Sequence, residues 1–106
     1  MPSKIITGSL GSVTPGTSQT FRDSFNISLT GTAVATVQIE KSYDRQNVAN
    51  DGAATWTVVS KDASGAAASF TTYPVNVVLN EPEIGIYYRV NCTAYTSGSV
   101  AYRLSQ

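Results

Sequence analysis

The stretch IYYRVNCTAYTSGSVAYRL, residues 86–104, indicates the fold class of this chain. Its apolar residues recur at every second position, with Ile86, Tyr88, Val90 and Cys92 on one face of an extended chain and polar residues on the other. Strict period-2 alternation is the pattern of a half-buried β-strand, whereas a helix repeats every three to four residues. The stretch therefore predicts antiparallel β-structure with one face in a core.

A short turn interrupts this alternation at Thr96-Ser97-Gly98. Three-residue hairpin loops favour a type I turn followed by a left-handed residue, and Gly98 stands where that glycine belongs. The loop length then predicts a hairpin in which Val90 and Cys92 lie beside Tyr102 and Leu104 on one face.

The same alternation recurs upstream of this stretch, with turn-forming residues between the runs. The further runs are residues 25–29, 35–39, 56–58 and 75–79. Short strands separated by turn signals at this spacing are typical of sandwiches and small barrels. The predicted fold is all-β, a single antiparallel β-sandwich that is immunoglobulin-like or jelly-roll-like.

The first twenty residues differ from the rest, being rich in Ser, Thr and Gly with few apolar residues. A chain of 106 residues fits one domain, so we expect a β-sandwich over residues 21–106 and an extended N-terminal arm or edge strand over residues 1–20. As an arm, the segment would contact a neighbouring subunit; as an edge strand, it would belong to its own sandwich. The predicted interface residues are Ile5, Ile6, Leu10 and Val13.

Composition excludes several classes of function. Seven basic and seven acidic residues give a net charge of zero, and a nucleic-acid binder would show a basic face. A neutral surface suits a subunit of an assembly. The single Cys92 cannot form an internal disulfide, and the start of the chain resembles neither a signal peptide nor a membrane span. We therefore expect synthesis in a cytoplasm and no nucleic-acid or membrane partner.

Catalytic groups are scarce in this sequence. It contains no histidine, which removes the commonest general base and every Ser-His-Asp or Cys-His arrangement. Cys92 falls on the apolar face of its strand, where a thiol behaves as a small hydrophobe. Glu81 and Glu83 are the nearest thing to paired carboxylates, but they flank Pro82 in what reads as a solvated turn. We predict no catalytic residue, no cofactor and no enzymatic activity.

Acidic and amide side chains gather in one predicted loop, at Asp44, Asn47, Asn50 and Asp51. Such oxygens can bind calcium, but Asx residues are also the ordinary chemistry of turns, and their spacing here matches no regular ligand set. The turn interpretation is favoured, and no metal site is predicted.

The segment from Ser42-Tyr43-Asp44 to Asp51-Gly52-Ala53-Ala54-Thr55-Trp56 resembles an Asp-box hairpin, S-x-D-x-G-x-x-W, with an insertion in its turn. In that motif the aspartate ties the turn and the tryptophan caps the core. The resemblance implies a structural role for Trp56, and the insertion places the Asp44 tie in question.

Residues 83–95 resemble the tyrosine-bearing penultimate strand of immunoglobulin-like and fibronectin-like sandwiches. A tyrosine hydroxyl in that strand pins the preceding corner of the chain. The resemblance assigns this role to Tyr87 or Tyr88.

Taken together, the lengthened hairpin and the terminal E-P-E-x-G-x-x-Y-R…Y-R-L-S-Q pattern resemble small virion structural proteins of tailed bacteriophages over residues 40–106. Within that class, a chain of this length is most like capsid decoration, or cement, proteins. The resemblance implies a β-rich homotrimer that binds the phage major capsid protein on the head, and a location in the virion after assembly in the bacterial host cytoplasm.

Two alternatives stay open. One is a head–tail connector or tail-associated β-sandwich module. The other is a carbohydrate- or receptor-binding module, because aromatic rings with polar rims can stack on sugars. The residues that would form such a face are Tyr73, Tyr87, Tyr95, Asn76, Asn80 and Asn91.

Overall fold

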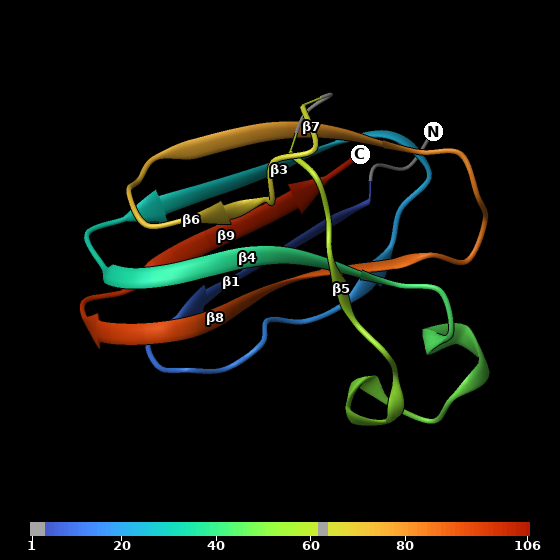
Figure 1. The fold of residues 1–106 in the computed structure, drawn as a ribbon, viewed down its shortest axis with the longest axis horizontal. Helices are drawn as coiled ribbons and strands as arrows, with labels where there is room; N and C mark the ends of the chain where they lie inside the picture. Colours follow the sequence, from blue (N-terminus) through green and yellow to red (C-terminus); the bar gives the residue numbers. More distant parts are fainter. Residues whose placement is uncertain (1–3, 62–63) are drawn as a thin grey trace.

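A computed structural model describes residues 4–61 and 64–106 of the chain. Within these ranges nine β-strands form two antiparallel sheets that pack face to face, and two 3-10 helices lie in a connecting loop (Figure 1). None of the helices in the described ranges is long and apolar enough to cross a membrane. The structure is the all-β sandwich that the alternation predicts.

One sheet has four strands, which lie in the order β1 (Ile5–Leu10), β9 (Val100–Ser105), β3 (Asp23–Gly31) and β7 (Val75–Glu81). The other has five strands, in the order β2 (Gln19–Thr20), β8 (Tyr87–Ser97), β4 (Val34–Ser42) and β5 (Thr57–Val58), with β6 (Ser69–Phe70) also paired with β4. The 3-10 helices η1 (Arg45–Asn47) and η2 (Asp51–Ala53) lie between β4 and β5.

The strand pairs follow a simple order along the chain. The first strand pairs with the last, β2 pairs with β8, β3 with β7, and β4 with β5 and β6. A long antiparallel ribbon of this kind, wrapped so that its pairs alternate between two sheets, is a jelly roll. Of the two predicted variants of the sandwich, the strand order matches the jelly roll.

The core lies between the two sheets and contains the inward members of each alternating run. Phe25 packs between Phe21 and Tyr88, with ring centroids 4.8 Å and 4.6 Å away. Cys92 is buried in the same cluster, as its place in the alternation predicts, and its thiol is free. The residues that are fully enclosed include Ile27, Leu29, Val37, Ile39, Val90 and Leu104.

The predicted terminal hairpin is wrong in its pairing. Val90 and Cys92 lie opposite Ile39 and Val37 of β4, whereas β9 pairs with β1 and β3 in the other sheet. The turn carries the chain across the sandwich at Gly98, whose φ of +79° favours glycine and whose added Cβ would lie 2.8 Å from the Cα of Ala33. Since both sheets turn their apolar faces to one core, alternation alone cannot distinguish neighbours within a sheet from residues opposed across it.

The N-terminal segment contributes strand β1 to the edge of the four-stranded sheet. All six of its residues pair with β9, from Ile5 opposite Ser105 to Leu10 opposite Val100. Of the predicted interface residues, Leu10 is buried in the chain's own core and Ile6 packs against that core. Ile5 and Val13 are 49% and 63% exposed, so these two side chains remain available to a partner.

The chain then crosses to the other sheet and covers the outer edge of β8. The amide of Gly16 donates to the carbonyl of Val90 at 2.7 Å, and the amide of Cys92 donates to the carbonyl of Thr14 at 3.0 Å. Strand β2 continues this pairing along β8. Residues 14–20 therefore complete the five-stranded sheet on that side.

Candidate functional site

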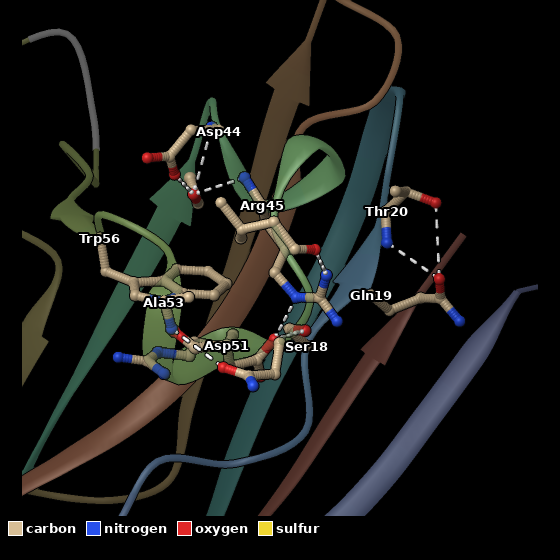
Figure 2. A network of polar contacts seen from close by, with 12 residues as sticks. Ser18, Gln19, Thr20, Asp44, Arg45, Asp51, Ala53 and Trp56 are labelled. Carbon is tan, nitrogen blue, oxygen red and sulfur yellow. Dashed lines mark hydrogen bonds and ion pairs between the residues drawn. The ribbon is translucent and has the colours of Figure 1, made fainter.

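Residues 43–56, the β4–β5 loop, extend beyond the strands at one end of the sandwich (Figure 1). The loop contains η1 and η2 and the acidic and amide side chains that the sequence clusters between residues 44 and 51. Hydrogen bonds and an ion pair tie the loop to itself and to the N-terminal segment, and cation–π contacts join it to β8. Figure 2 shows part of this network.

The Asp44 side chain ties the two ends of this loop. Its Oδ1 accepts hydrogen bonds from the hydroxyl of Ser42 at 2.7 Å and from the amide of Thr55 at 2.9 Å. The amide of Arg45 donates to the Ser42 oxygen at 3.1 Å. The hydrogen bonds that Asp44 accepts, that from Ser42 first and then that from the Thr55 amide, lower its pKa. The aspartate tie of the Asp-box resemblance is thus present despite the insertion.

A second tie joins the loop to the N-terminal segment. The carboxylate of Asp51 accepts from Arg45 Nε at 2.6 Å and from the hydroxyl of Ser18 at 2.7 Å (Figure 2). The Arg45 guanidinium also lies over the ring of Tyr87 on β8, 5.1 Å from its centroid. Arg45 and Asp51 together therefore fix the loop against β8 and the N-terminal segment.

Trp56 lies outside the hydrophobic core, so the predicted core cap is wrong. Its indole N–H donates to the carbonyl of Asp51 at 3.0 Å, and its ring stacks on the Arg89 guanidinium at 4.1 Å from the centroid. The side chain is half-buried. Trp56 immediately precedes the two-residue β5, where alternation is too short to show which face the ring takes.

Beneath the indole ring, Arg89 forms an ion pair with Glu40 on the outer face of the sheet. Arg89 Nε lies 2.8 Å from Glu40 Oε1, and the side-chain Nδ2 of Asn91 donates to Oε2 at 3.0 Å. Gln38 donates to the same oxygen. Burial raises the pKa of Glu40, but the hydrogen bonds from Asn91, Gln38 and Arg89 together bring it below its ordinary value. The carboxylate is held ionised, as a structural ion pair requires.

The loop residues considered for calcium are used in other ways. Asp44 and Asp51 make the ties above, and Asn50 Oδ1 accepts from the amide of Ala53 at 3.0 Å. Asn47 ends η1 at an exposed position. Over residues 4–61 and 64–106, no three His, Cys, Asp or Glu side chains lie close enough together to hold a metal ion.

The two carboxylates near Pro82 have different surroundings. Glu83 is exposed, as a solvated turn predicts, but Glu81 is buried. Glu81 Oε1 accepts from the Tyr88 hydroxyl at 2.7 Å and lies 3.7 Å from Lys41 Nζ. Tyr88 therefore pins the corner before its strand, the role that the resemblance assigns to Tyr87 or Tyr88. Burial and the Glu81 carboxylate raise the pKa of Tyr88.

The six residues of the predicted sugar-binding face do not come together. Tyr73 Oη lies 3.0 Å from the carbonyl of Ala35, and Tyr95 donates to the carbonyl of Gly98 at 2.8 Å. Tyr87 is stacked with Arg45. The asparagines are divided between the sheets, Asn76 and Asn80 in β7 and Asn91 in β8.

Comparison with known proteins supplies a fold match. No family model and no curated protein matches the chain. Among solved structures, the chain is similar to the SPBc2 prophage-derived protein YomS, with a TM-score of 0.60 and 7% sequence identity over 99% of this chain and 95% of that one. This similarity shows a shared fold. It extends over nearly the whole chain and so includes the N-terminal segment as well as the two sheets.

One exposed apolar residue, Val78, is not among the residues predicted from the sequence. Val78 of β7 is 65% exposed, among the most exposed of the large apolar side chains in the described residues. The sequence signal is the doubled valine at positions 77 and 78, which breaks the period-2 pattern and must place one valine on the outer face. Ile84, in the corner after β7, is 69% exposed as well.

Proposed function

We propose that this chain is a non-enzymatic structural protein of a tailed-bacteriophage virion, and that it decorates and stabilises the capsid. The observation that carries the proposal is the jelly-roll fold, which it shares over nearly its whole length with a prophage-derived protein. The resemblance of residues 40–106 to phage virion proteins points the same way. The proposed partner is the major capsid protein, and the proposed location is the outer face of the head.

The state of the polar side chains supports a structural role. Glu40, Arg45, Asp51 and Arg89 all have their charges paired within the chain. A reactive site needs a group whose proton or electron pair can be given to a substrate, and these groups are instead held in fixed contacts. The β4–β5 loop is therefore built as a shaped, rigid surface, which suits docking on a repeated lattice.

Repetition on a capsid also favours oligomers. Several subunit contacts that are individually weak act together once one of them is held, which raises the overall affinity. The homotrimer implied by the resemblance is one such assembly and stays a prediction. Ile5 and Val13, exposed in the N-terminal segment, are the residues of the predicted interface that a neighbouring protein can reach.

The proposal is tested on virions of the encoding phage that lack this protein. Purified protein is added back, and its position is located by cryo-electron microscopy. We expect saturable binding to the head surface and greater resistance of the heads to heat or chelation. Heads of an unrelated phage serve as the control. Binding confined to the neck or tail would support the connector or tail module instead, and selective binding to glycans would support the receptor-binding alternative.

A further inference from the structure

Strand β7 leaves one of its two edges without a partner strand in the described part of the chain. It pairs with β3 over seven residues in unbroken register, from Val75 opposite Leu29 to Glu81 opposite Asp23. It is the last strand of its sheet. In an antiparallel strand, alternate residues point their N–H and C=O groups to each side, so β7 presents a row of backbone donors and acceptors away from β3.

The edges of the five-stranded sheet are protected in recognisable ways, whereas β1, at the other end of the four-stranded sheet, is an edge strand like β7. Strands β5 and β6 are two residues long, and β8 is covered by residues 14–20, which include Pro15. Residues 75–80 of β7 include no charge and no proline, and their register shows no bulge; the one charged residue of the strand, Glu81 at its end, is buried. Long, flat, uncharged edges are the ones that pair with another chain.

The sequence of β7 is self-complementary about Val78. In an antiparallel pair of two β7 strands with Val78 opposite its own copy, Val77 lies opposite Leu79 and Asn76 lies opposite Asn80. Every position from 76 to 80 then meets a residue of its own kind. The flanking prolines, Pro74 and Pro82, are equally distant from Val78 and would end the pairing at the same point on both sides.

The two faces of β7 also match across such a pair. Asn76, Val78 and Asn80 are exposed on the outer face, whereas Val77 and Leu79 are half-buried and pack against the core. Pairing would bring two Val78 side chains together, set amide opposite amide, and continue the apolar inner face from one sandwich to the next. Residues 76–80 carry no charge, so the register opposes no like charges and favours a neutral partner such as the strand itself.

Space beside β7 is consistent with an incoming strand. A cleft of about 320 Å³ lies where the two sheets part next to this edge, lined in part by Leu79, Asn80, Val58 and Tyr88. The chain does not fold a strand over this opening within its described residues.

We propose that β7 pairs antiparallel with β7 of a second copy of this chain, with a two-fold axis at Val78 that joins two four-stranded sheets into one. Such a contact is isologous: the same patch serves both copies, and the assembly closes with two. It therefore gives a dimer in solution instead of the homotrimer implied by the family resemblance. The contact needs no capsid, so it stands or falls independently of the proposed function.

The test measures molar mass by light scattering over a range of protein concentration. The unaltered protein should be a dimer that dissociates on dilution. Val78→Lys and Val78→Glu each place like charges opposite one another across the axis, and each should weaken the dimer at least about tenfold. An equimolar mixture of the two variants should restore a dimer, because Lys then faces Glu. This rescue is specific to a position that meets its own copy.

Thr7→Lys is the matched control, because Thr7 is also exposed on an edge strand of the same sheet, β1. It should leave the dimer unchanged, and circular dichroism should show that all three variants keep the fold. A monomer or trimer at every concentration, a dimer that Thr7→Lys breaks, or two charge variants that fail to associate when mixed would each overturn the proposal. Binding to phage heads is assayed separately, so a failure there leaves this result unaffected.

Discussion

Strand β8 has one edge that faces away from β4, and strand β7 has one edge that faces away from β3. The described part of the chain pairs with the free edge of β8 but not with that of β7. Residues 14–20 run along β8, with hydrogen bonds at Gly16 and Cys92. Within residues 4–61 and 64–106, no segment pairs with the outer edge of β7, where Val78 remains exposed. The difference teaches that the N-terminal segment serves first to complete its own sandwich, and that the opposite side of the molecule is where a second chain fits.

The two sides also differ in how polar side chains are used. Beside β8 the β4–β5 loop is fixed by Asp44, Asp51 and the Arg89–Glu40 pair. The outer face of β7 offers the neutral amides of Asn76 and Asn80. Changes on the β8 side are therefore expected to act on stability, and changes at β7 on association.

The largest effect is expected from removing residues 1–13. This deletion takes away all of β1 and the buried Leu10 side chain, whose loss alone is worth about 2–5 kcal/mol in a typical core. Domains of this size are stable by about 5–15 kcal/mol, so the truncated protein should be largely unfolded by circular dichroism. Ile5→Ser, at an exposed position of the same strand, is the control and should fold. A truncated protein with native melting behaviour would show that β1 is dispensable.

The next largest effect is expected at the buried ion pair. Arg89→Met leaves the Glu40 carboxylate enclosed without its cation, which should cost about 3–5 kcal/mol in the free energy of unfolding. Arg103→Met removes an exposed arginine from β9 and should change stability by less than about 0.5 kcal/mol. Urea unfolding of both variants measures the difference. Equal effects at the two positions would mean that the pair does not fix the β8 side.

Trp56→Ala should have a smaller effect than loss of a core ring. The variant loses a stacked guanidinium contact and one hydrogen bond, together about 1–3 kcal/mol. Phe25→Ala, which empties a core position, should cost about 3–5 kcal/mol. Thermal melts rank the two variants. If the Trp56→Ala protein were less stable than the Phe25→Ala protein, Trp56 would have to be a core residue after all.

Two groups should limit stability at opposite ends of the pH range. Glu40 has a lowered pKa, so its stabilisation is present above its ordinary value of 4.5 and is lost as pH falls below it. Tyr88 has a raised pKa, so its contribution is complete below its ordinary value of 10.0 and is lost as pH rises above it. Melting temperatures against pH should show a flatter acid limb in Glu40→Gln and a flatter alkaline limb in Tyr88→Phe. Some loss of stability at acid pH should remain in Glu40→Gln, because the pKa of Asp44 is lowered as well. Limbs unchanged by these variants would contradict the assignment.

The sequence predicts which face of each strand is buried better than it predicts which strands pair with one another. Alternation places Val90, Cys92, Tyr102 and Leu104 in the core, and all four are there. It does not show that β8 and β9 belong to different sheets, because both arrangements bury the same side chains. The strand partner is set by contacts far apart in the sequence, which a local pattern does not contain.

The same limit explains the polar residues. Glu81 reads as solvated from its neighbours in the sequence, but Lys41 and Tyr88 enclose it from β4 and β8. The Asp-box resemblance makes Trp56 a cap on the core, but Arg89 provides it with a partner outside the core. In each case the deciding contact comes from another strand of the fold.

The most direct test of the contrast between the two edges is amide hydrogen exchange, followed residue by residue from dilute to concentrated protein. The amide of Cys92 should be protected at every concentration, because its acceptor, Thr14, is in the same chain. Alternate amides of residues 76–80 should exchange quickly in dilute solution and slow as concentration rises, and Val78→Lys should abolish this dependence. Amides of β7 that exchange at one rate at all concentrations, or a Cys92 amide that becomes protected only on concentration, would contradict the account.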